Sequence, residues 1–75
     1  MYKYKKLKEI EKDLINKGVT QENAYFTALF MVFPNKLKSE IKNKYPTITD
    51  DNLNHFINIT IPNLVNEYYP KFKKS

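Results

Sequence analysis

Packing alone must stabilise this chain, because it has 75 residues and no cysteine. A chain of this length builds at most one small core, which gives only a few kcal/mol of net stability. Without cysteine, neither disulfide bonds nor thiolate metal sites can add to that stability. Six tyrosines and five phenylalanines are available instead, and each aromatic ring can bury roughly 150–250 Å². We therefore expect one domain over residues 1–75.

The first segment predicts an amphipathic helix over residues 3–17. One face of this helix carries Tyr4, Leu7, Ile10, Leu14 and Ile15. Lysines and glutamates occupy the opposite face, as expected for a helix that covers a core along one side. Gly18 is the only glycine of the chain and follows the last apolar position. A glycine in a left-handed conformation commonly ends a helix at this point.

The second segment predicts a helix that is apolar on nearly all sides. Thr20 is a suitable N-cap, and almost every residue from 25 to 33 is apolar. Such a helix is buried on most sides, so we expect it to be the central helix of the fold. Alternatively, its surplus apolar surface forms a homodimer interface or docks another protein. The candidate interface residues are Phe26, Phe30, Met31 and Phe33.

Two further helices are predicted in the second half of the chain. Residues 34–45 begin with a proline and carry a narrow apolar stripe of Leu37, Ile41 and Tyr45. A fourth helix begins at Thr49 or Asp50 and runs toward Pro70. Its apolar face consists of Leu53, Phe56, Ile57, Ile61, Leu64, Val65 and Tyr68.

Pro62 interrupts the fourth helix, and the apolar face continues in phase across it. The proline therefore kinks this helix or divides it into two helices. The alternating residues 57–61 leave a β-strand as the alternative. The predicted fold class is an all-α bundle of four to five short helices, with the second helix at its centre.

The formal net charge of +5 comes from lysine without a single arginine. Arginine is the side chain that clamps phosphates and reads guanine edges, whereas lysine acts as a flexible point charge. Residues with AT-rich codons dominate the composition, so we attribute part of the basicity to coding bias. Such a bias suits a phage, a plasmid or a low-GC bacterium. The net charge alone therefore does not predict nucleic-acid binding.

No catalytic pattern is recognisable in the sequence. His55 is the only histidine and lies about 200° from Leu53 around the predicted helix, on its solvent side. Asp50 and Asp51 are placed to stabilise a helix N-terminus. A single glycine cannot build a phosphate-binding loop, and metal sites need several converging ligands. We expect no enzymatic activity, no cofactor and no metal ion.

The two ends of the chain interleave aromatic residues with lysines. These basic tails, at about residues 1–6 and 70–75, are typical of surfaces that bind single-stranded nucleic acid or an anionic membrane. The candidate nucleic-acid contacts are Lys3, Lys5, Lys6, Lys8, Tyr69, Lys71, Phe72, Lys73 and Lys74, with Tyr2 and Tyr4 beside them. In the alternative interpretation, the tyrosines close the ends of the core and the lysines keep the protein soluble.

The third and fourth predicted helices have about the length of a helix-turn-helix motif. In that motif the N-terminal residues of the second helix meet the DNA. Here that helix begins with Asp50 and Asp51, and its exposed face offers asparagines and His55 but no lysine. The sequence therefore predicts a degenerate helix-turn-helix at most.

These patterns favour a non-enzymatic helical protein that acts by protein–protein contact, as a regulator, inhibitor, immunity or assembly factor. The partner is another protein or a second copy of the chain. The alternative is an accessory or transcriptional regulatory protein that binds nucleic acid. No signal peptide is recognisable, and the longest apolar run, residues 28–33, is far shorter than the roughly 20 residues of a membrane span. We therefore expect a cytoplasmic protein.

Overall fold

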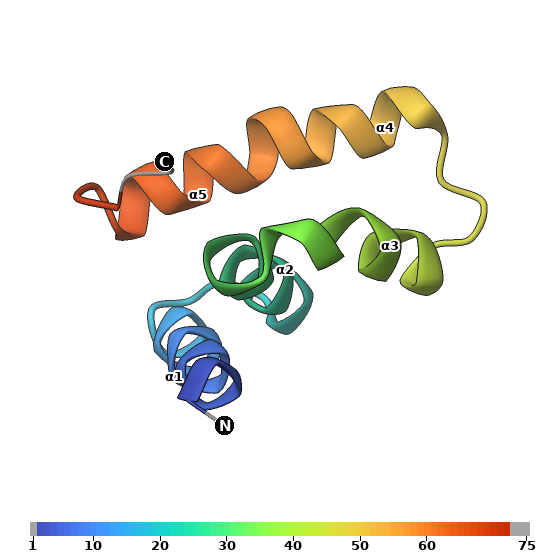
Figure 1. Cartoon of the computed structure of the whole chain (residues 1–75). Helices are drawn as coiled ribbons and strands as arrows, with labels where there is room; N and C mark the ends of the chain where they lie inside the picture. The colour runs from blue at the N-terminus through green and yellow to red at the C-terminus, as the bar shows by residue number, and fades with distance from the viewer. Residues whose placement is uncertain (1, 73–75) are drawn as a thin grey trace.

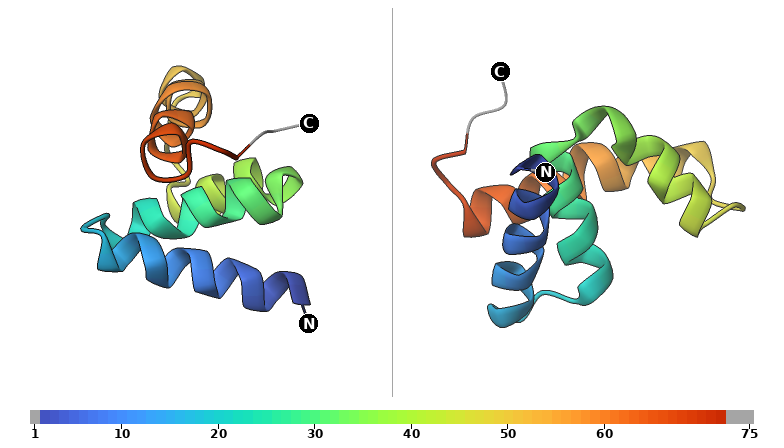
Figure 2. Two further views of the ribbon diagram at one scale, coloured as in Figure 1. Left: turned by 90° about the vertical axis from the view of Figure 1, so that its left-hand side faces the viewer. Right: turned by 60° about the horizontal axis from the view of Figure 1, so that its bottom comes forward.

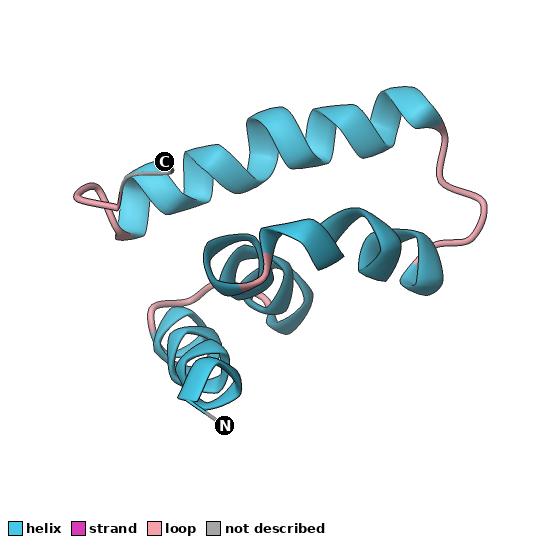
Figure 3. Cartoon of the chain, in the orientation of Figure 1, coloured by secondary structure: helices cyan, strands magenta, loops and turns pink. Residues whose placement is uncertain are grey.

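The computed structural model describes residues 2–72, which form a small bundle of helices (Figures 1 and 3). The elements are α1 (Tyr2–Asn16), α2 (Gln21–Val32), α3 (Pro34–Lys44), α4 (Asp50–His55), the π-helix η1 (Phe56–Thr60) and α5 (Ile61–Tyr68). The predicted all-α bundle is confirmed. The β-strand alternative for residues 57–61 is wrong, because these residues are helical.

A tight turn joins α1 to α2. Gly18 has a φ of +99°, which glycine adopts without the steric cost of a side chain. The Val19 N–H donates to the Leu14 carbonyl at 3.0 Å and so closes the end of α1. Thr20 then caps α2 by accepting a hydrogen bond from the Asn23 N–H at 3.4 Å. The two helices lie side by side and run in opposite directions (Figure 2, left).

The buried face of α1 is narrower than the sequence predicts. Leu7, Ile10 and Leu14 are buried, whereas Tyr4 is 57% exposed and Ile15 is 41% exposed. The reason is that α1 packs chiefly against one neighbour, α2. Ile15 lies about 100° around the helix from Leu14, too far to reach that contact. Residues 2–6, predicted as a basic tail, form the first turns of α1.

Helix α2 is the central element, as predicted. It contacts α1, α3 and α5, and in Figure 1 it lies between α1 and the long helix that contains α4 and α5. Phe26 is 2% exposed and Phe30 is 8% exposed, so both rings belong to the core. Most apolar side chains of α2 therefore pack inside the molecule. Phe26 and Phe30, which the sequence offers as interface candidates, are thus buried within the described part of the chain.

Helix α3 follows α2 directly and covers the core along one edge. Pro34 occupies its first position, where the missing N–H of proline costs nothing. Leu37 and Ile41 are buried, whereas Tyr45 follows the end of the helix and is 38% exposed. The predicted apolar stripe is thus correct for two of its three residues.

The last three elements form one continuous helix (Figure 1). Thr49 caps it by accepting a hydrogen bond from the Asn52 N–H at 3.2 Å. In η1 the Ile61 N–H bonds to the Phe56 carbonyl, five residues back. A proline in a regular helix clashes with the carbonyl four residues before it, and the wider turn lies directly before Pro62. Pro62 therefore stands in the first turn of α5, directly after a π-turn, and the helical backbone continues across the interruption that the sequence predicts.

Candidate functional site

Described residues near the two ends of the chain line one groove beside the end of α2. The segment after α5 turns back toward the side of the molecule where α1 begins (Figure 2, left). This arrangement leaves a groove of about 500 Å³, which we call the terminal groove. It is lined by Lys3, Lys6 and Ile10 of α1, Met31 and Val32 of α2, and Tyr69 and Phe72 after α5.

The terminal groove has an apolar floor and a basic rim. Ile10 is buried, and Met31 and Val32 are half-buried at the end of α2. Lys3 and Lys6 are exposed, and they lie within about 60° of Ile10 around α1. Among the described residues, neither lysine has a carboxylate within ion-pair distance. Apolar surface and unpaired positive charge therefore lie side by side.

Tyr69 fastens one wall of the groove to α1. Its hydroxyl donates a hydrogen bond to Asp13 Oδ2 at 2.5 Å. Lys17 Nζ lies 3.0 Å from the same oxygen and 5.1 Å from the centre of the Tyr69 ring. The Tyr69 hydrogen bond and the Lys17 ammonium lower the pKa of Asp13. Burial and Asp13 raise the pKa of Tyr69. The carboxylate on this side of α1 is thus already paired.

The structure divides the predicted nucleic-acid contacts into separate groups. Lys3, Lys6, Tyr69 and Phe72 come together in the terminal groove, and Lys71 is exposed next to Phe72. Lys5 and Lys8 lie on the opposite side of α1, about 140–200° from Lys3. The Lys8 ammonium is 3.8 Å from Glu11 and 5.6 Å from the centre of the Tyr4 ring. Lys73 and Lys74 lie outside the described residues, as does the side chain of Tyr2.

The predicted interface residues of α2 are divided in the same way. Met31 faces the terminal groove. Phe33 lines a different groove, together with Tyr4 and Lys36, and the Lys36 ammonium lies 5.2 Å from the centre of its ring. Phe26 and Phe30 are in the core. The four residues therefore do not form one surface.

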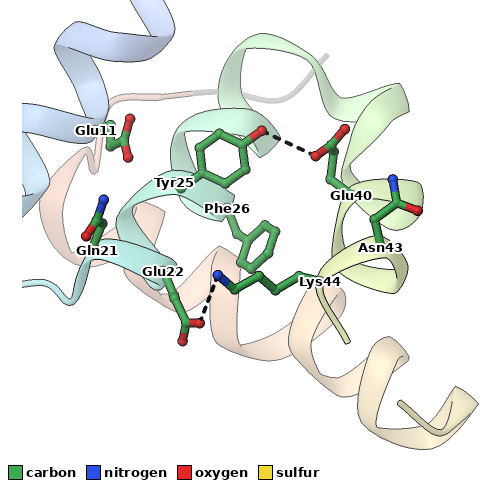
Figure 4. A pocket seen from close by; sticks show the side chains of 8 residues that line it. All are labelled: Glu11, Gln21, Glu22, Tyr25, Phe26, Glu40, Asn43 and Lys44. Carbon is green, nitrogen blue, oxygen red and sulfur yellow. Dashed lines mark hydrogen bonds and ion pairs between the residues drawn. The ribbon is translucent and has the colours of Figure 1, made fainter. Parts of the chain in front are cut away.

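A second, larger pocket lies between α1, α2 and α3 (Figure 4). Its volume is about 670 Å³. Its lining consists of Glu11, Gln21, Glu22, Tyr25, Phe26, Glu40, Asn43 and Lys44. This pocket was not predicted, because its carboxylates come from three helices and share no sequence motif.

Each carboxylate of the larger pocket already has a partner. The Tyr25 hydroxyl donates to Glu40 at 3.4 Å, and Lys44 lies 3.5 Å from Glu22. Glu11 pairs with Lys8. Burial, followed by the charge of Glu40, raises the pKa of Tyr25. The Tyr25–Glu40 and Lys44–Glu22 pairs join α2 to α3, and the Lys8–Glu11 pair lies within α1. The carboxylates of the larger pocket therefore have partners within the molecule, whereas Lys3 and Lys6 of the terminal groove have none among the described residues.

The remaining chemistry-bearing residues form no site. His55 is exposed, and Asp50 and Asp51 lie in the first turn of α4. Within residues 2–72 no three His, Cys, Asp or Glu side chains are close enough to hold one metal ion. The continuous helix from Asp50 to Tyr68 contains no lysine or arginine, which disfavours its use as a DNA-recognition helix.

No helix in the described part of the chain combines the length and hydropathy that a bilayer span requires. No family model, curated protein or solved structure that was compared with the chain matches it.

Proposed function

We propose that this protein is a non-enzymatic binding module that recognises another protein through the terminal groove. One observation carries the proposal: half-buried apolar side chains and unpaired lysines line the same groove at the meeting point of the two chain ends. Protein interfaces combine an apolar centre with a polar rim. A groove of about 500 Å³ accommodates a few side chains of a partner.

Met31 and Phe72 are suited to the centre of such a contact. Both are half-buried and line the groove, so a partner can cover surface that the monomer leaves partly exposed. Methionine adapts its shape to different partners, and aromatic side chains contribute strongly to interface energies. The floor beneath them is fixed by Ile10, which belongs to the core.

Site-specific crosslinking in cells of the source organism tests this proposal. A photo-reactive p-benzoylphenylalanine replaces Phe72 or Lys6 in the groove, and in the controls it replaces Lys12 or Ile59. Lys12 is exposed on the other side of α1, and Ile59 is exposed in η1. We expect the same protein to be crosslinked from both groove positions and from neither control. Equal crosslinking at all four positions would contradict the proposal.

Nucleic-acid binding is the second candidate, because the two basic ends do converge at Lys3, Lys6 and Phe72. Two features count against it. The Tyr69 ring is engaged by Lys17 rather than free to stack on a base, and Lys5 and Lys8 face away from the groove. Fluorescence anisotropy with a single-stranded oligonucleotide of about 20 nucleotides tests this candidate. Absence of binding at low salt eliminates it, since phosphate contacts are strongest there.

A further inference from the structure

We infer that the terminal groove takes an acidic linear segment, in which one or two large apolar side chains are flanked by aspartate or glutamate. This inference rests on the proposed function and specifies the chemistry of the partner. It depends on the charge of the rim, the size of the floor and the distribution of charge over the rest of the chain.

The rim favours carboxylates because its lysines are not neutralised from within the molecule. Lys3 and Lys6 are exposed and have no acidic partner among residues 2–72. Asp13, on the same side of α1, is already bound by the Tyr69 hydroxyl and the Lys17 ammonium. A carboxylate of the partner can therefore approach the rim without displacing an existing ion pair. Complementary charge of this kind selects partners and speeds their encounter.

The floor favours a short segment rather than a broad folded surface. The groove holds about 500 Å³, which is in the lower half of the range for ligand sites and suits a small number of side chains. Ile10, Met31, Val32 and Phe72 provide the apolar contact. A peptide that inserts apolar anchors into a groove and places its charges at the rim uses a common mode of peptide recognition.

The long helix carries the opposite charge, so an acidic ligand is not drawn to that side of the molecule. Residues 50–69 contain Asp50, Asp51 and Glu67 but no lysine or arginine. The start of α1, residues 2–8, contains four lysines and no acidic residue. An acidic segment is therefore repelled by the long helix and attracted to the meeting point of the chain ends.

Selection from a random peptide library tests this inference. A phage-displayed library of peptides of about 12 residues is selected on the immobilised full chain. Each enriched peptide is then synthesised and measured against variants of the chain. V32Q alters the apolar floor and so identifies peptides that bind in the groove. K3E/K6E reverses the rim, and K5E/K12E makes the same charge change on the other side of α1. Circular dichroism confirms that every variant is folded.

We expect the groove-dependent peptides to carry aspartate or glutamate around leucine, methionine or an aromatic residue. K3E/K6E should weaken their binding about five- to tenfold, and K5E/K12E by less than about twofold. Enrichment of groove-dependent peptides that are neutral or basic would overturn the acidic partner and leave the proposed function standing. If V32Q weakens the binding of none of the enriched peptides, the acidic partner and the proposed function are both contradicted.

A second copy of the chain is the competing occupant. Sedimentation of the wild-type chain and of K3E/K6E distinguishes it from a linear segment. We expect both to sediment as monomers. A concentration-dependent dimer that K3E/K6E abolishes would overturn the inference, because the groove would then be filled by another copy.

Discussion

The Tyr69 hydroxyl reaches Asp13 across 56 positions of sequence and joins the C-terminal segment to α1. Lys17, in the turn directly after α1, completes the arrangement. This contact decides whether a groove exists, because Tyr69 and Phe72 form the wall that faces Lys3 and Lys6. A hydrogen bond to an ionised carboxylate is stronger than one between neutral groups. The contribution of the Tyr69–Asp13 hydrogen bond to stability therefore depends on the charge of Asp13.

Replacing Tyr69 with phenylalanine should destabilise the fold by an amount that depends on pH. The pKa of Asp13 is lowered from its ordinary value of 3.8. A lowered folded-state pKa contributes stability above the unfolded value and loses it as the pH falls through the folded value. The pKa of Tyr69 is raised above 10.0, so its contribution is present below that value and is lost as the pH rises beyond it. The advantage of the wild type over Y69F should therefore be largest between these limits.

Urea unfolding of the wild type and Y69F across this pH range measures the difference. The same pair of variants in a D13N background is the control. There the difference in unfolding free energy should no longer change with pH on the acid side. A difference between wild type and Y69F that stays constant as the pH falls well below 3.8 would show that Asp13 is not the acceptor.

At the scale of elements, local signals in the sequence predict where most helices begin and end. Gly18, Thr20, Pro34 and Thr49 act within one or two turns, so their effect is readable without the fold. The π-turn η1 was not predicted, since it arises where Pro62 meets an otherwise continuous helix. The exposure of Ile15 also depends on how many neighbours its helix has, which the helical period alone does not reveal.

Replacing Phe30 with alanine should cost about 3–5 kcal/mol of unfolding free energy. The ring is 8% exposed on the central helix α2, and a chain of this size has little stability to spare. Urea unfolding measures the loss, and F30L, which retains most of the apolar volume, keeps the comparison possible if F30A does not fold. A loss below about 1 kcal/mol for F30A would mean that the ring is not packed in the core.

At the scale of the whole molecule, charge and apolar surface are unevenly distributed. The chain ends bring lysines and half-buried apolar side chains together beside α2, while the long helix from Asp50 to Tyr68 carries acidic residues and His55 but no lysine. The basic ends are predictable from the sequence, but their division into separate groups of lysines is not. That division depends on the direction in which each lysine leaves α1 and on the path of the chain after α5. Ile10 and Val32 were not predicted to line a groove, because in the sequence they resemble ordinary core residues.

Nuclear Overhauser cross-peaks between the Phe72 ring and the side chains of Met31 and Val32 test most directly whether the chain ends meet at α2. These three residues line one groove, so we expect the cross-peaks in the free protein, together with Val32 methyl shifts displaced by the aromatic ring. A Phe72 ring with random-coil shifts and no cross-peaks to α2 would contradict the existence of the terminal groove.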